Sequence, residues 1–132
     1  MAEMTGRCLC GAVTYTARDV ETEFRACHCG MCRRWSGGPA FAVHAGGVEF
    51  RGEEHIRRYD SSPWAERGFC ARCGSNLFYR LKPGGTPILW LGTLDDQAGC
   101  RLVGEIYVDA KPEGYGLAGD HPRLTESDLQ NP

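Results

Sequence analysis

Eight cysteines carry most of the chemistry that this sequence suggests, and seven of them fall into three clusters. The clusters have the spacings C-x-C, C-x-C-x-x-C and C-x-x-C, and they comprise Cys8 and Cys10, then Cys27, Cys29 and Cys32, then Cys70 and Cys73. Cysteines this close in sequence make cramped disulfides but good metal chelates. The N-terminus lacks the apolar core of a signal peptide, and cytosolic thiols are kept reduced. We therefore predict a cytoplasmic metal-binding protein rather than one with four disulfides.

Two of the clusters can form one closed site. Tetrahedral zinc holds its sulfurs roughly 3.8 Å apart, and the first and third clusters can each supply two sulfurs at that separation. Together they would make a structural four-cysteine site of Cys8, Cys10, Cys70 and Cys73. Three protein ligands and an open position are typical of catalytic zinc, and the cysteines left for such a site are Cys27, Cys29 and Cys32. Counting favours this division, but the middle cluster can instead pair with one of the others.

Two further residues bear on this division. His28 is a candidate fourth ligand of the middle cluster, although on an extended segment it alternates away from its neighbours. Packing or a hydrogen bond near the site is our preferred interpretation of His28. Cys100 lies outside every cluster, and a lone cysteine usually serves as a small apolar residue. His121 has no partner that the sequence reveals.

The elements that must position the clusters are short strands. Alternating apolar residues predict strands within residues 11–17, 39–45 and 48–52, with a hairpin turn at Gly46 and Gly47 between the second and third. Residues 55–61 are a further, more polar strand candidate. Two more strands, within residues 77–81 and 86–94, flank a Pro-Gly-Gly turn. Residues 101–110 predict another strand, with Leu102, Ile106 and Val108 on one face. The one short helix lies at "GMCRRWS", residues 30–36, and the segment after residue 110 looks irregular.

The bulk properties bound the class of protein. The 132 residues suit one domain, which we place at residues 1–132. A net charge of −2 argues against a protein that binds nucleic acid or anionic lipid. No run of eighteen apolar residues predicts a membrane span. We expect a mainly β domain with cysteines on its turns.

The ordered motifs resemble one family. They are "CLCG" at residues 8–11, "CHCGMCRRWSGGPAF" at 27–41, "YDSS" at 59–62, "RGFCARCGSNLFY" at 67–79 and "LGTLDD" at 91–96. In this order they resemble the glutathione-dependent formaldehyde-activating enzymes, the group that includes centromere protein V. The resemblance extends over about residues 6–115 of the 132.

The resemblance implies a fold and an activity. The fold is a β-tent of folded, mostly antiparallel sheets that carry zinc. The resemblance places a structural zinc on the first and third clusters, and a second zinc on the middle cluster where the substrate thiol binds. The implied reaction condenses formaldehyde with glutathione to S-hydroxymethylglutathione, which is a carbon–sulfur lyase reaction run in reverse. Arg33, Arg34 and Arg72 are candidates to bind the glutathione carboxylates. Trp35 is bulky where the family commonly has small residues, and we interpret it as ordinary packing.

Two other classes of function compete with the enzyme. One is a non-catalytic zinc module that binds another macromolecule, for which a filled fourth position on the second metal would be typical. The other is redox chemistry of metal-free thiols in the middle cluster. Two zincs per chain would count against the redox hypothesis. We expect an open three-cysteine site to lose its zinc more readily than a closed site, after which its thiols can oxidise.

Overall fold

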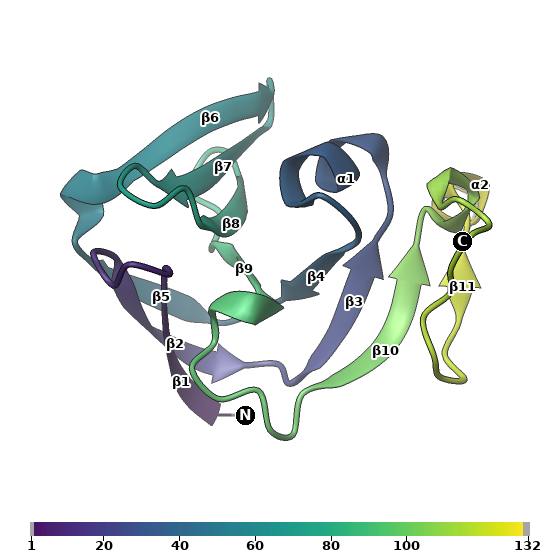
Figure 1. Cartoon of the computed structure of the whole chain (residues 1–132), viewed down its shortest axis with the longest axis horizontal. Coiled ribbons are helices and arrows are strands. Elements are labelled where there is room, and N and C mark those ends of the chain that lie inside the picture. Colours follow the sequence, from purple (N-terminus) through teal and green to yellow (C-terminus); the bar gives the residue numbers. More distant parts are fainter. Residues whose placement is uncertain (1, 131–132) are drawn as a thin grey trace.

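The computed structural model describes residues 2–130, which form strands joined by turns and loops, together with two short α-helices (Figure 1). The helices are α1 (Gly30–Ser36) and α2 (Glu126–Gln130). The strands of the first half are β1 (Ala2–Arg7), β2 (Thr14–Val20), β3 (Glu23–Cys27), β4 (Ala40–Val43), β5 (Gly47–Arg51) and β6 (Ile56–Ser62). Those of the second half are β7 (Ala65–Cys70), β8 (Asn76–Leu81), β9 (Ile88–Trp90), β10 (Arg101–Ile106) and β11 (Arg123–Leu124). The predicted mainly β fold is confirmed, and it is a β-tent.

The strands are divided between two sheets. One sheet has the order β1-β2-β5, and the other has the order β11-β10-β3-β4-β9-β8-β7-β6. All neighbours are antiparallel except β10, which pairs in parallel with β3 and with β11. In Figure 1 the larger sheet runs from β6 at the upper left to β11 at the right, with α1 drawn between its two ends. The predicted strand pair around the Pro-Gly-Gly turn is confirmed as β8 and β9.

The hairpin predicted at Gly46 and Gly47 is wrong. The strands before and after these glycines belong to different sheets, because β4 pairs with β3 and β9 while β5 pairs with β2. Both edges of β4 are thus occupied, so β5 has no free edge of β4 to join. The backbone N–H of Gly46 instead donates to the carbonyl of Arg18, 2.8 Å away, as the chain crosses between sheets.

Residues 101–110 also differ from the prediction. The strand β10 ends at Ile106, and Val108 lies in a 3-10 turn (Val108–Ala110) rather than on the strand. The register shifts between Leu102 and Gly104, so the alternation that the sequence shows is interrupted. The buried positions of β10 include Glu105, a charged residue. The segment predicted to be irregular contains β11 and α2.

The main core lies between the two sheets. Val13, just before β2, and Tyr15 and Ala17 within β2 are buried in this core. They pack with Leu77 and Leu89 of the larger sheet. The hydroxyl of Tyr15 is 2.6 Å from the hydroxyl of Thr93. Two cysteines, Cys8 and Cys70, are fully buried members of the same core. A smaller cluster packs Cys32 against Ala40 and Trp90.

The helices of residues 2–130 are all too short, or not apolar enough, to cross a membrane.

Candidate metal centres

The structure brings the first and third cysteine clusters together. Cys8 and Cys10 lie in the turn after β1, and Cys70 and Cys73 lie at the end of β7 and in the turn that follows. All four sulfurs lie within 4.8 Å of one another. The Sγ atom of Cys10 is 3.7 Å from that of Cys8 and 3.8 Å from that of Cys70. These separations fit the roughly 3.8 Å spacing of sulfurs around tetrahedral zinc.

The two turns are shaped to present the sulfurs. Gly11 and Gly74 both have a φ of +80°, a region in which a side chain would be strained. The N–H of Gly74 closes its turn on the carbonyl of Cys70 at 2.8 Å. Donors also face the sulfurs, since the N–H of Val13 lies 3.3 Å from the Sγ of Cys8. Hydrogen bonds from the hydroxyl and the N–H of Ser75 lower the pKa of Cys73 to about 5, which favours the thiolate that binds metal.

The middle cluster forms a second group of sulfurs. Cys27 ends β3, Cys29 is the N-cap of α1, and Cys32 lies in the first turn of that helix. Their three sulfurs lie within 4.8 Å of one another. The N–H of Cys32 donates to the Sγ of Cys29 at 3.3 Å. Hydrogen bonds from the thiols of Cys27 and Cys32 lower the pKa of Cys29, while those thiols have raised pKa values. The geometry therefore suits a metal ion with three thiolate ligands.

Within residues 2–130, no further cysteine, histidine or acidic side chain joins the three sulfurs of this second group. His28 lies between two of the cysteines in sequence, but its Nε2 atom is 2.7 Å from Oε1 of Glu105. Its imidazole therefore serves a buried hydrogen bond, as our preferred interpretation predicted. Among the described residues, the cysteine, histidine and acidic groups that could hold an ion here are therefore the three cysteines alone.

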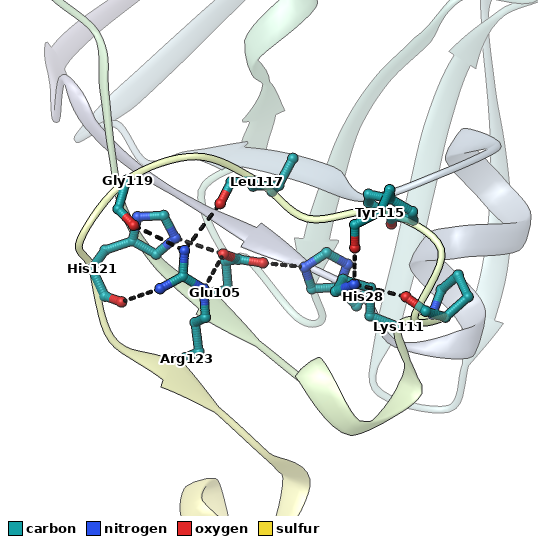
Figure 2. A network of polar contacts seen from close by, with 9 residues as sticks. His28, Glu105, Lys111, Tyr115, Leu117, Gly119, His121 and Arg123 are labelled. Carbon is teal, nitrogen blue, oxygen red and sulfur yellow. Dashed lines mark hydrogen bonds and ion pairs between the residues drawn. The ribbon is translucent and has the colours of Figure 1, made fainter.

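A buried polar network anchors the loop of the second group (Figure 2). Glu105 of β10 is 1% exposed, and its Oε1 contacts His28. Its other oxygen, Oε2, lies 2.6 Å from Nε2 of His121 and 3.1 Å from Nε of Arg123. The backbone N–H of His28 also donates to the carbonyl of Ile106 at 3.1 Å. One carboxylate thus joins the cysteine loop, β10 and the C-terminal segment.

The partners of Glu105 decide its protonation. Burial alone would raise the pKa of Glu105, but hydrogen bonds from His121 and His28 and the positive charge of Arg123 lower it below its ordinary value. The carboxylate is therefore charged at neutral pH. The sequence analysis missed Glu105, although a lone acidic residue inside the apolar run "RLVGEIYV" signals a buried charge with partners elsewhere.

An arginine that the sequence analysis also missed lies directly against the second group. Arg67 of β7 is 3% exposed, and its Nη2 atom is 3.6 Å from the Sγ of Cys32. Its guanidinium lies over the rings of Tyr79 at 5.0 Å and Trp35 at 5.9 Å. The predicted candidates Arg33, Arg34 and Arg72 are all exposed.

The remaining predicted residues have packing or turn roles. Trp35 stacks on Tyr59 with ring centroids 6.2 Å apart and meets the edge of Phe69 at 5.7 Å. Cys100 is half-buried and packs against the main core, as a small apolar residue would. Asp96, the last residue of the "LGTLDD" motif, accepts a hydrogen bond from the N–H of Ala98 at 2.9 Å, which is typical of a turn.

The fold and the cysteine groups define a β-tent protein with two candidate metal centres. Comparison with known proteins agrees with this class. Residues 3–110 match the sequence profile of the glutathione-dependent formaldehyde-activating enzymes, and the chain belongs to this family. An uncharacterized lyase of Schizosaccharomyces pombe is 30% identical over 133 residues, which cover 98% of this chain and 96% of the lyase.

Two other similar proteins extend the comparison. A putative glutathione-dependent formaldehyde-activating enzyme of Halomonas elongata is 34% identical over 86 residues, covering 57% of this chain and 54% of that protein. The crystal structure of a Rhodobacter sphaeroides protein superposes with a TM-score of 0.60 at 22% identity, covering 91% of this chain and 99% of its own. At that identity the likeness concerns the fold alone. The family and the names of its members support an enzyme.

Proposed function

We propose that the chain is a zinc-dependent carbon–sulfur lyase-like enzyme that acts on a thiol–aldehyde adduct such as S-hydroxymethylglutathione. One observation carries the proposal. Within residues 2–130, the second sulfur group lacks a fourth protein ligand, whereas the first group has four. In a family whose members are named for glutathione and formaldehyde, an open position beside three thiolates suits the thiol of a substrate. The proposal treats residues 1–132 as one zinc-binding domain.

The proposed reaction forms a carbon–sulfur bond without oxidation or reduction. The thiol sulfur bonds to the carbon of formaldehyde, the carbon–oxygen π bond breaks, and the thiol proton ends on the new hydroxyl group. A zinc ion held by Cys27, Cys29 and Cys32 would lower the pKa of a bound thiol and so favour its nucleophilic thiolate. The reverse reaction releases the thiol and the aldehyde.

The residues of the chain have separate tasks in this proposal. The three cysteines supply thiolate ligands from the end of β3 and the first turn of α1. Arg67 faces the sulfur of Cys32 and partly offsets the negative charge that three thiolates bring together. His28 and Glu105 hold the loop that carries the cysteines. The group of Cys8, Cys10, Cys70 and Cys73 would bind a structural zinc that joins β1 to β7.

The test measures zinc content and formaldehyde–glutathione exchange in the same samples. We expect two zincs per wild-type chain and an exchange rate well above the spontaneous rate. Cys29→Ser should keep the structural zinc, lose the second and fall to the spontaneous rate. Cys100→Ala is the matched control, because this cysteine lies outside both groups, and it should behave as wild type.

Two results would contradict the proposal. Zinc-saturated wild type that leaves the exchange of every thiol and aldehyde tested at its spontaneous rate would favour a non-catalytic zinc module instead. Activity that persists in Cys29→Ser after its second zinc is lost would remove the three-cysteine group from the mechanism.

A further inference from the structure

The three sulfurs of the second group face different kinds of hydrogen-bond donor. The backbone N–H of Cys32 donates to the sulfur of Cys29 at 3.3 Å, and the N–H of Cys29 donates to the sulfur of Cys27. The sulfur of Cys32 instead faces the Nη2 atom of Arg67, 3.6 Å away. The next N–H along α1, that of Arg33, is already committed to the carbonyl of Cys29 at 2.8 Å. At Cys32, an arginine side chain thus takes the place of a backbone donor.

Arg67 brings a full positive charge to this sulfur. Its neighbour in sequence, Glu66, pairs with other arginines, and within residues 2–130 no carboxylate forms an ion pair with Arg67. The rings of Tyr79 and Trp35 lie against the guanidinium, whose central carbon is 5.0 and 5.9 Å from their centroids. Arg67 and Cys32 are both buried, and a charge acts more strongly on its neighbour where water is excluded. The packing therefore directs this charge at one sulfur.

A metal centre that handles an aldehyde must keep its own sulfurs from reacting with it. If the thiolate of Cys32 attacked formaldehyde, its sulfur would bond to the carbon, the π electron pair would move to the oxygen, and water would protonate that oxygen and leave hydroxide. The sulfur would then no longer be the thiolate that binds zinc. The nucleophilicity of a sulfur falls as its basicity falls, and a charged hydrogen-bond donor lowers both. Arg67 therefore opposes this loss of a ligand.

We propose that Arg67 makes Cys32 a poor nucleophile, so that the aldehyde reacts with the substrate thiol and not with a sulfur that holds the metal. The inference rests on the proposed function for the identity of the electrophile. Arg67 is a positioning residue in this proposal, because it acts through Cys32. The backbone donors at Cys27 and Cys29 carry no net charge, so removal of Arg67 should affect one of the three sulfurs selectively.

Alkylation of the zinc-loaded chain by iodoacetamide tests this selectivity, because peptide mass analysis after brief exposure gives a rate for every cysteine. Arg67→Met keeps a long side chain without the charge. It should raise the rate at Cys32 by about tenfold or more, and the rates at Cys27 and Cys29 by less than about twofold. Arg67→Lys restores the charge and should restore most of the protection. Arg57→Met, at an exposed arginine on the neighbouring strand β6, is the matched control and should react as wild type.

Cobalt(II) in place of zinc gives a spectroscopic measure of the same contact. Its thiolate complexes absorb in the near ultraviolet by charge transfer from sulfur to metal, and this band moves to lower energy as the sulfur becomes richer in electrons. Cobalt(II) is added to chains that already hold one zinc, so that it enters the second group. We expect the band of Arg67→Met to lie at lower energy than that of wild type, and the band of Arg57→Met to be unchanged. A merely loosened fold would weaken cobalt binding without this shift.

A second variant keeps the test decisive if Arg67→Met does not fold. Arg67→Gln retains a neutral donor, and it should raise the alkylation rate at Cys32 by about threefold or more.

The outcomes distinguish this inference from the proposed function. Equal acceleration at Cys27, Cys29 and Cys32 in a folded, uncharged Arg67 variant, no acceleration at all, or an unshifted cobalt band would overturn the role of Arg67. A selective effect of Arg67 on Cys32 in a protein that leaves formaldehyde–glutathione exchange at its spontaneous rate would sustain that role and contradict the lyase proposal.

Discussion

Two buried charged side chains, Glu105 and Arg67, lie beside the loop of the second sulfur group. They differ in how many of their polar atoms have partners within the chain. Glu105 has three partners within the chain: hydrogen bonds with His28 and His121 and an ion pair with Arg123. The Nη2 atom of Arg67 contacts the sulfur of Cys32, and its Nε and Nη1 make no hydrogen bond among residues 2–130. A buried charge whose partners come from several segments stabilises one arrangement of the loop. We therefore treat Glu105 as a positioning residue of the cysteine loop and Arg67 as a positive charge that faces the sulfur of Cys32.

Glu105→Gln tests the positioning role through the pH dependence of stability. At neutral pH we expect the variant to be less stable by about 3 kcal/mol, because removal of one buried charge leaves its partners uncompensated. The pKa of Glu105 is lowered in the folded chain from its ordinary value of 4.5. Its contribution is therefore fully present above pH 4.5 and is lost as the pH falls through the lower folded value.

Urea unfolding of both zinc-loaded proteins at a series of pH values measures this difference. Zinc is released from both proteins as acid protonates their cysteines, so only the gap between the two curves reports on Glu105. The exposed Glu23→Gln, on the adjacent strand β3, should shift stability by no more than about 0.5 kcal/mol. A gap that stays constant below pH 4.5 would exclude the lowered pKa as its origin.

At the scale of elements, the parallel strand β10 connects the second sulfur group to the C-terminal segment. It pairs with β3, which ends at Cys27, and with β11, which follows His121. Figure 2 shows the C-terminal segment beside β10, with His121 and Arg123 directed at Glu105. The first sulfur group lies on other elements, at the ends of β1 and β7. The C-terminal segment should therefore support one candidate centre and not the other.

Removal of residues 120–132 should loosen the second zinc selectively. The truncation deletes His121, Arg123 and β11, so Glu105 would retain only His28 as a partner. Release of zinc to a coloured chelator should have two phases, and we expect the faster phase to accelerate at least fivefold while the slower one is unchanged. Removal of residues 126–132 keeps His121 and Arg123 and should alter neither phase. Equal acceleration of both phases would contradict the idea that the C-terminal segment supports only the second sulfur group.

At the scale of the whole molecule, the two sulfur groups differ in how much of the fold depends on them. Cys8 and Cys70 are fully buried in the core between the sheets, and they connect the smaller sheet to the larger one. Cys27 and Cys29 are half-buried on the edge of a minor cluster. A metal bound by the first group would cross-link segments about sixty residues apart, which restricts the unfolded chain strongly.

Loss of one zinc should consequently have different effects at the two sites. Cys8→Ser should reduce the zinc content to one per chain and lower Tm by roughly 10 °C or more, since metal binding at a structural site contributes directly to folding. Cys29→Ser should lose the same amount of zinc and lower Tm by less than about 3 °C. Differential scanning calorimetry with parallel metal analysis measures both. Equal losses of Tm would contradict a structural role confined to the first group.

The sequence by itself determined what depends on local spacing. The short separations of the cysteines predicted three local clusters of candidate ligands. Alternating or continuous apolar residues predicted strands where β2, β4, β5, β8 and β9 lie, and residues 30–36 were expected to form the short helix α1. These features follow from the geometry of a few successive residues, which is the same wherever the segment lies. The ordered motifs also predicted the family correctly.

Only the tertiary structure decided which distant residues meet. The separate sheets of β4 and β5, the parallel pairing of β10 and the meeting of Glu105 with His28 and His121 join segments far apart in the chain. An arginine between Glu66 and Gly68 does not reveal its burial, so Arg67 resembled a surface residue in the sequence, and only the fold of β7 places it against Cys32. Burial and the choice of partner are properties of the packed fold, because they depend on contacts that local sequence does not encode.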